Sequence, residues 1–432
     1  MKKAWIIVLA TAMLLSVCGC ADRAGKNSAQ TTLDAEAETG RVELVMATIG
    51  ESASFGADRR IYSAADGFNA SQERYHLTVV NYNTGENGNT AAGEEQGMTR
   101  LLTEIAAGQY PDLICFDNIS PYPFIAKGVL LDMESCMAED EDIRIEDIMC
   151  YRALRAWGGV YLMGDWLSAD GLYALRSRFG DRDGWTIQEY LDIESSLPEG
   201  ARMLCMVTKE QFLERMVMNY LGTAIDWENG TCSFNNQSFI ALLEAARRIR
   251  ETELDSKNDE FGDNEKEYLQ AGRYIAAYFG VPSPFDIEYF YEDWMTPIGW
   301  PTVDGRCGTM VYYQNPVGIM AQSEHIDGAW AFVKYLLMTP DETNFRMPSW
   351  RPLMEDALQR AQHCETFPCI TAEQGEAFMA LLDRVEIFYK HDPIVLNIIM
   401  KECEPFLAGE RSAEDTAARI QSRMQIYVAE QG

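Results

Sequence analysis

The sequence has few positive charges for its length. Its 36 Lys and Arg residues stand against 67 Asp and Glu residues, which gives a net charge of −31. Such a surface repels the phosphate backbone of nucleic acids, so nucleic-acid binding is excluded. The same field disfavours anionic substrates, although a locally basic pocket would override it.

Familiar catalytic patterns are also lacking. There are only four His residues, and the Gly-x-Ser-x-Gly, His-Glu-x-x-His and phosphate-loop patterns are absent. A serine, cysteine or zinc hydrolase is therefore not expected, and we expect no metal and no cofactor. A glycan-active enzyme stays open as an alternative, because the two carboxylates of a glycosidase can lie far apart in the sequence.

Cysteines are scattered, and nine of the eleven follow the first twenty residues. An odd, dispersed set does not resemble a disulfide framework, so most are expected to be small buried side chains. Cys364 and Cys369, beside His363, form the one close pair. A structural zinc site usually needs four ligands, so zinc is not expected here, and whether the two cysteines pair stays open.

The N-terminus predicts export. Two lysines precede twelve residues, Ala4 to Leu15, that are apolar except for Thr11, which is too short to span a bilayer and is typical of a signal peptide. The following Val17-Cys18-Gly19-Cys20 resembles the bacterial lipobox. We therefore expect a signal peptide over residues 1–19, lipidation at Cys20, and a flexible tether over 20–40. No later stretch approaches 18 consecutive apolar residues.

The remaining sequence alternates strand and helix patterns. Strands are predicted at 42–48, 75–82 and 112–116, and helices at 57–68 and 98–106. This alternation is typical of a parallel α/β sheet, in which ligands bind beyond the carboxyl ends of the strands. Asp117, Asn118 and Tyr122 follow the third strand and are placed where a ligand could be touched.

Three groups of motifs carry a family resemblance. The first runs from Gly108-Gln109-Tyr110-Pro111-Asp112 to Lys127-Gly128 and Asp132. The second is Gly299-Trp300-Pro301 with Ala329-Trp330-Ala331-Phe332. The third is the tail from Pro405-Phe406 to Tyr427. In order and spacing these motifs resemble the carbohydrate-type, maltose-binding-protein-like family 1 of extracellular solute-binding proteins, which are lipoproteins of ABC importers.

The resemblance implies a two-lobe, type II periplasmic-binding-protein-like α/β fold. Each lobe is expected to be a mostly parallel sheet flanked by helices. Lobe 1 would comprise 41–163 with 300–340, and lobe 2 would comprise 164–299 with 341–432. The hinge is expected to cross near 163–169, 294–300 and 338–345, and the lobes to close around the solute.

The implied function is capture of a sugar or oligosaccharide and its delivery to an ABC transporter permease. The expected protein is a monomer and not an enzyme, anchored by lipid on the extracellular face of a Gram-positive type of cell membrane. A non-transport adhesin or sensor lipoprotein is the other alternative. Predicted ligand contacts, chosen by their positions after strands and near crossings, are Asp117, Asn118, Asp165, Trp166, Trp300, Tyr312 and Tyr313.

Overall fold

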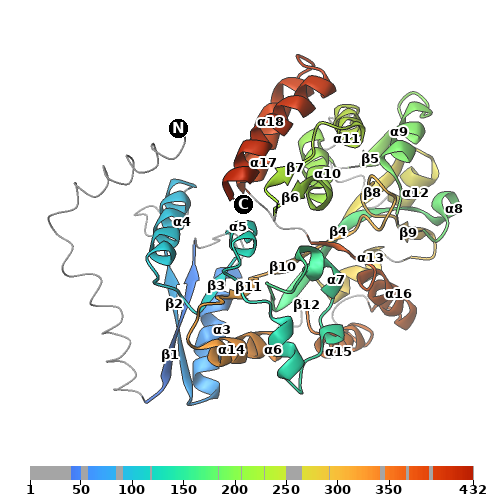
Figure 1. Ribbon diagram of the computed structural model, residues 1–432. Helices are drawn as coiled ribbons and strands as arrows, with labels where there is room; N and C mark the ends of the chain where they lie inside the picture. Colours follow the sequence, from blue (N-terminus) through green and yellow to red (C-terminus); the bar gives the residue numbers. More distant parts are fainter. Residues whose placement is uncertain are drawn as a thin grey trace, which may run out of the picture.

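The computed structural model describes most of the chain after residue 39 (Figure 1). The described residues are 40–49, 57–83, 91–116, 119–182, 184–205, 207–227, 229–249, 265–290, 292–340, 346–365, 369–388 and 393–431. The signal segment, Cys20 and the tether up to residue 39 lie outside these ranges, so their roles stay predictions. Within the ranges, no helix has both the length and the apolar character needed to cross a bilayer.

The smaller lobe is built on a four-stranded sheet in the order β11-β3-β1-β2 (Figure 1). The strands are β1 (Val42–Thr48), β2 (Tyr75–Asn81), β3 (Leu113–Cys115) and β11 (Val317–Ile319). The first three are parallel, which confirms the prediction, and β11 is antiparallel to β3. The main helices are α3 (Ala57–Ser71), α4 (Ala91–Ala106) and α14 (Ile326–Met338).

The helical period of α3 explains how this lobe forms its core. Ile61, Ala65 and Phe68 are buried, and their spacing puts them on one side of the helix. The ring of Phe68 packs edge-on against Phe332 of α14, with ring centroids 5.5 Å apart. Two helices that are far apart in sequence thus share one hydrophobic core.

The larger lobe contains a seven-stranded sheet whose main path is β13-β10-β4-β8-β5. The strands are β4 (Trp166–Leu175), β5 (Arg202–Cys205), β8 (Tyr274–Val281), β9 (Met295–Pro297), β10 (Met310–Gln314), β12 (Met347–Pro348) and β13 (Ile387–Phe388). Every pairing of the central strand β4 is antiparallel. The two-lobe α/β prediction is confirmed, but a mostly parallel second sheet was wrong, because the neighbours of β4 run back toward the smaller lobe.

Both faces of this sheet are covered by helices, since side chains alternate along β4 between two hydrophobic clusters. Leu167 and Ala169 join one cluster, whereas Leu172 and Ala174 join the other. The first face carries α12 (Glu265–Gln270), α13 (Ile287–Phe290), α15 (Arg351–Ala361) and α16 (Ala372–Leu382). The second carries α9 (Ile187–Ser195), α10 (Lys209–Ala224), α11 (Gln237–Arg247), α17 (Pro393–Leu407) and α18 (Ala413–Gln431).

Short elements fill the connections. They are α5 (Tyr122–Ala126), α6 (Glu134–Glu139), α7 (Tyr151–Leu154), α8 (Arg176–Phe179) and the hairpin strands β6 (Ile225–Asp226) and β7 (Thr231–Cys232). The Asn229-Gly230 turn joins β6 to β7, and the side chains of Thr186 and Asn236 cap α9 and α11.

The chain changes sheets between Met163 and Trp166, between Gln314 and Val317, and between Met338 and Met347. The first and third crossings match the predicted hinge segments. The second lies later than predicted, because β9 and β10 both pair with β4. By strand pairing, β9 and β10 belong to the sheet of the larger lobe, and the predicted lobe boundaries stay predictions.

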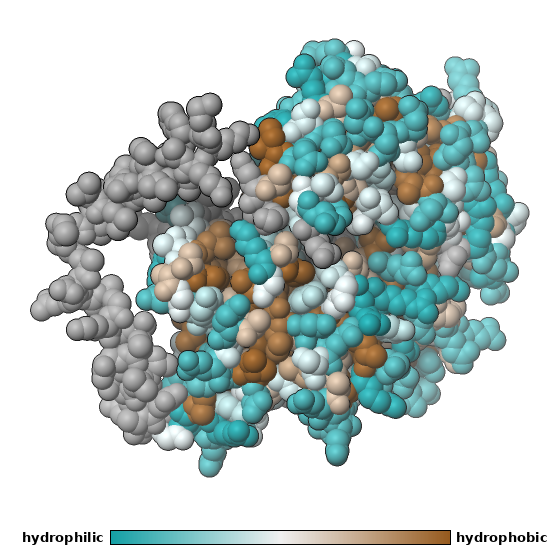
Figure 2. Space-filling view, viewed as in Figure 1, coloured by the Kyte–Doolittle hydropathy of each residue, from teal (hydrophilic) through white to brown (hydrophobic). Residues whose placement is uncertain are grey.

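The first two crossings approach each other closely at Gly164. A side chain there would clash with the Gln314 carbonyl oxygen, so glycine is required. On the face shown in Figure 2, hydrophilic residues dominate the upper helices, and hydrophobic residues gather over the smaller lobe and toward its border with the larger one.

Candidate functional site

A cleft of about 1400 Å³ lies between the lobes. One wall comes from α5, α7 and the turn that follows α7, whereas the other comes from the end of α10 and the β6–β7 hairpin. β13 of the larger lobe contributes Ile387 and Phe388. In Figure 1, α5 and the hairpin face each other across this border. The cleft is thus built from segments that are far apart in sequence.

Aromatic side chains are prominent on both walls. They are Tyr122, Tyr151, Trp157, Tyr161, Trp227 and Phe388. The rings of Tyr122 and Trp227 stack across the lobes, with centroids 5.3 Å apart and planes 15° from parallel. This contact joins α5 to the hairpin directly, so the lobes are held together at this point.

Trp157 continues the aromatic series along the smaller lobe. Its ring meets Tyr122 edge-on at 5.5 Å and Phe388 edge-on at 5.2 Å. Phe388 in turn stacks on Tyr313 at 5.8 Å. Edge-to-face contacts of this kind fix ring orientation, so these rings form a stable apolar wall.

Charged side chains also line the cleft, and some are already held by partners. Arg155 forms an ion pair with Glu134, with Nε 2.6 Å from Oε1. Asp226 accepts hydrogen bonds from the Asn229 backbone N–H at 2.9 Å and its side-chain amide at 2.8 Å. Arg155 and Asp226 therefore help to fix their own segments.

A polar corner of the cleft is formed by Asn219 and Arg306. Asn219 is 5% exposed, and its Nδ2 donates to the Arg215 carbonyl oxygen at 3.2 Å. Its Oδ1 is buried without a hydrogen-bond partner among the described residues, and so is Nε of Arg306. A buried acceptor and a buried donor are thus left for an occupant of the cleft to satisfy.

Tyr161 adds a protonated phenol to the smaller-lobe wall. Burial raises the pKa of Tyr161, and the nearby carboxylates of Asp132 and Glu134 raise it further. The hydroxyl therefore remains protonated at neutral pH and can donate a hydrogen bond.

The predicted site residues lie elsewhere, or outside the described part of the chain. Asp117 and Asn118 fall outside it. Trp300 is fully buried, and its Nε1 donates to Oδ1 of Asp170 at 2.6 Å. In this conformation Trp300 belongs to the core of the larger lobe and presents no face to the cleft.

The other four predicted residues sit along β4, β10 and the first crossing. Asp165 is buried, and its carbonyl oxygen accepts from the Ser349 N–H at 3.1 Å. Trp166 lies under the Arg346 guanidinium, 4.6 Å from the ring centroid. Tyr313 donates to the Met149 carbonyl oxygen, and Tyr312 lies half-buried in β10. None of the four lines the cleft, and their contact with a ligand stays a prediction.

Tyr122, which follows the third predicted strand, lines the cleft, whereas Trp157, Trp227 and Arg306 were not among the predicted contacts. Trp227 closely precedes Asn229-Gly230, a dipeptide that favours a tight hairpin turn, so the sequence did indicate that Trp227 lies on a hairpin. Trp157 and Arg306 lie in irregular turns with no pattern, so only the fold brings them to the cleft.

Asp170 forms a second polar group inside the larger lobe. Its Oδ2 accepts from the Tyr278 hydroxyl at 2.9 Å and from Arg215 at 3.4 Å. Burial raises the pKa of Asp170, although Arg215, Trp300 and Tyr278 act in the opposite direction. Because Trp300 occupies its other oxygen, this carboxyl is part of a packed network.

Metal binding finds no support among the described residues, since no three His, Cys, Asp or Glu side chains gather to hold an ion. In the Cys364–Cys369 pair, Sγ of Cys369 lies 2.9 Å from the Cys364 carbonyl oxygen, and both thiols are free.

Comparison with known proteins identifies the fold. No protein-family model and no curated protein sequence matches the chain. Among solved structures, a periplasmic oligogalacturonide-binding protein from Yersinia enterocolitica is 14% identical with a TM-score of 0.56, over 90% of this chain and 100% of the other. The sugar-binding protein MalE from Xanthomonas citri is 14% identical with a TM-score of 0.54, over 90% of this chain and 98% of the other.

A de novo designed cysteine esterase is similarly related, at 13% identity and a TM-score of 0.53 over 90% of this chain and 98% of the other. At such low identity these likenesses establish the architecture and leave the ligand open. The chain has the two-lobe α/β fold of extracellular solute-binding proteins.

Proposed function

We propose that this protein is a membrane-tethered extracellular receptor that captures a carbohydrate between its lobes and delivers it to an ABC transporter permease. The observation that carries the proposal is the interlobe cleft, whose aromatic walls come from both lobes. A solute bound there would contact both lobes at once and would stabilise the closed arrangement.

The cleft chemistry suits sugars. Aromatic rings offer flat apolar faces to the C–H faces of pyranose rings, while hydroxyls need both donors and acceptors. Asn219 Oδ1 and Arg306 Nε provide one of each, and both atoms are buried without a hydrogen-bond partner among the described residues. A neutral hydrogen bond contributes only about 1 kcal/mol, so affinity requires several such contacts together.

The cleft size favours an oligosaccharide over a single sugar ring. Typical small-molecule pockets have volumes of about 300–1000 Å³, whereas this cleft measures about 1400 Å³. The aromatic side chains that line the cleft would contact several rings along a sugar chain. The names of two similar structures, an oligogalacturonide-binding protein and a sugar-binding protein, agree with this class.

Lipid anchoring through Cys20 completes the proposal. A receptor tethered beside its permease keeps a high effective concentration there, and the segment 20–40 would set its reach. Cys20→Ala should release folded, solute-competent protein from the membrane fraction. Continued retention on the membrane would contradict the anchor.

A thermal-shift screen across neutral and charged mono- and oligosaccharides tests the receptor role. Binding to the folded state raises the unfolding midpoint, so at least one carbohydrate should do so without being consumed. Chromatography of the same mixtures tests the enzyme alternative, because formation of a new product would indicate a glycan-active enzyme and contradict the receptor proposal. If no carbohydrate shifts the midpoint, the proposal fails.

A further inference from the structure

The charge of the cleft differs from the charge of the whole molecule. The sequence has 36 basic residues against 67 acidic ones. Among the described residues that line the cleft, the three arginines Arg152, Arg155 and Arg306 outnumber the acidic Asp226 and Glu386. An acidic protein thus presents a locally basic cleft.

The ion pairs on the walls show which charges remain for a ligand. Arg155 is held by Glu134, and Asp226 is held by Asn229. Arg152 is exposed and takes part in no ion pair or hydrogen bond among the described residues. The side chain of Arg306 forms one ion pair among the described residues, a long one of 3.7 Å from Nε to Oδ1 of Asp304. Besides the paired groups, Arg152 and Arg306 thus share the cleft with one further carboxylate, that of Glu386.

Asn219 gives the second, independent observation at the same place. It lines the cleft and, with Arg306, also lines a small adjoining cavity. Its Oδ1 is buried without a hydrogen-bond partner among the described residues. An amide oxygen accepts hydrogen bonds and cannot donate them, so this atom requires a donor such as a hydroxyl group. A guanidinium beside an unsatisfied acceptor matches an anionic group with a hydroxyl next to it.

We propose that the solute is an anionic oligosaccharide, whose acidic groups bind Arg306 from the larger lobe and Arg152 from the smaller lobe while a neighbouring hydroxyl donates to Asn219. This inference rests on the proposed carbohydrate function and adds the charge of the ligand. Planar carboxylates, as in uronic acids, match the forked donors of arginine.

The overall negative charge does not oppose this assignment. At physiological ionic strength, exposed charges are screened beyond about 8 Å. The groups that line the cleft therefore determine the local attraction, and the distant acidic surface slows the approach of the ligand without preventing its binding.

Isothermal titration calorimetry on the purified full chain tests the inference. The probes are trimers of galacturonate and glucuronate, with neutral trimers of galactose and glucose as matched controls and a sulfated galactose trimer to separate carboxylate from sulfate. We expect at least one anionic trimer to bind about tenfold tighter than its neutral counterpart, because charge-assisted hydrogen bonds are about twice as strong as neutral ones. Its affinity should fall as salt rises.

Variants locate the effect. Arg306→Gln and Arg152→Gln should each weaken the anionic trimer about tenfold and should weaken neutral trimers clearly less, whereas Glu386→Gln should strengthen binding of the anionic trimer. Arg144→Gln, at an exposed arginine that pairs with Asp147 and does not line the cleft, is the matched control and should change nothing. Unfolding midpoints of all variants verify folding.

Two outcomes would overturn the inference. Neutral trimers that bind as tightly as anionic ones, with no effect of either arginine variant, would leave a receptor for neutral carbohydrate. Absence of binding by every anionic trimer would also reject it, and the wider neutral panel would then decide the proposed function separately.

Discussion

The contact between Asp170 and Trp300 shows how the core of the larger lobe accommodates a buried carboxyl group. The carboxyl lies on the middle strand of the sheet, and the indole N–H donates to it at 2.6 Å within the core. A buried carboxyl without donors would be strongly unfavourable, so Trp300, Tyr278 and Arg215 together make its position tolerable. Trp300 is therefore important for folding.

Trp300→Ala should lower the free energy of unfolding by about 3–5 kcal/mol, because it opens a large cavity in the core and removes a donor from Asp170. Denaturant unfolding followed by circular dichroism measures the change. An unfolding free energy close to the parent value would contradict the burial of Trp300.

Asn219→Leu tests the unpartnered oxygen. The substitution removes a buried acceptor that has no hydrogen-bond partner among the described residues and the one hydrogen bond that Nδ2 donates to the Arg215 carbonyl oxygen. The free energy of unfolding without ligand should therefore fall by no more than about 1 kcal/mol, and the free energy of solute binding should weaken by about 1 kcal/mol. Thermal unfolding with and without ligand measures both. A large loss of stability without ligand would show that the oxygen has a structural partner.

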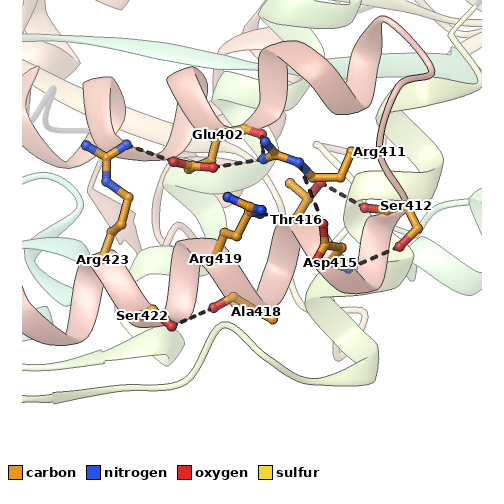
Figure 3. A network of polar contacts seen from close by, with 9 residues as sticks. All are labelled: Glu402, Arg411, Ser412, Asp415, Thr416, Ala418, Arg419, Ser422 and Arg423. Atoms are coloured by element: carbon orange, nitrogen blue, oxygen red, sulfur yellow. Dashed lines mark hydrogen bonds and ion pairs between the residues drawn. The ribbon is translucent and has the colours of Figure 1, made fainter.

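At the scale of elements, α17 and α18 are joined by a network of polar contacts at one end of the larger lobe (Figure 3). Glu402 of α17 accepts from Arg411 and from Arg423, both at 2.8 Å. Asp415 lies 3.8 Å from Arg411 and 3.5 Å from Arg419. These contacts fix the pairing of two helices that pack on the sheet.

The pKa of Glu402 gives this network a pH dependence. Partial burial alone would raise that pKa, but the hydrogen bonds from Arg423 and Arg411 outweigh it and lower the pKa below its ordinary value. The ionised Glu402 therefore stabilises the folded state fully above its unfolded-state pKa of about 4.3. This stabilisation is lost as the pH falls through the lower folded-state pKa.

Glu402→Gln should therefore cost about 1 kcal/mol of stability at pH 7, near the upper end for partly exposed ion pairs. The difference from the parent should shrink toward zero as the solution is acidified below about pH 4. Urea unfolding at several pH values measures it. A difference that is constant with pH would contradict the ionic origin.

The elements of the smaller lobe were predictable because local patterns determine them. The strand at Val42–Thr48 and the helix with buried Ile61, Ala65 and Phe68 have clear periods. The motif residue Asp112 also has a structural role, since Oδ2 accepts from the Val45 N–H at 2.8 Å and Oδ1 from Ser323 at 2.6 Å. Such motifs identify a fold through its packing.

The antiparallel surroundings of β4 and the cleft residues were not predictable. Strand direction around β4 depends on where the chain returns from the smaller lobe, which no local pattern encodes. Tertiary packing within the smaller lobe brings Trp157 to Tyr122, and only the meeting of the lobes adds Trp227. Position near the predicted second crossing favoured Trp300 instead, but Trp300 is buried in the core.

At the scale of the whole molecule, the stack of Tyr122 on Trp227 links the two lobes across the cleft. An aromatic pair contributes about 0.5–1.5 kcal/mol beyond the area it buries. An energy of this size is enough to shift the equilibrium between open and closed lobes. It is also small enough for solute binding to outweigh it.

Trp227→Ala should shift the unliganded protein toward an open arrangement, with a larger radius of gyration in small-angle X-ray scattering. Solute affinity should fall by up to about tenfold, because closure loses this contact and the ring no longer faces the solute. Ile426→Ala, at an exposed side chain of α18, serves as a control. Unchanged scattering and affinity would contradict a role in closure.

The most direct test of the receptor role is calorimetric titration of the parent protein and Trp157→Ala with the carbohydrate found in the thermal screen. We predict that one solute binds per chain and that no product forms. Trp157→Ala should lose at least about tenfold in affinity. Tyr110→Ala is the control and should bind as the parent does, because Tyr110 is an exposed aromatic side chain that does not line the cleft. Equal affinity for the parent and Trp157→Ala would place the solute elsewhere and contradict capture in the interlobe cleft.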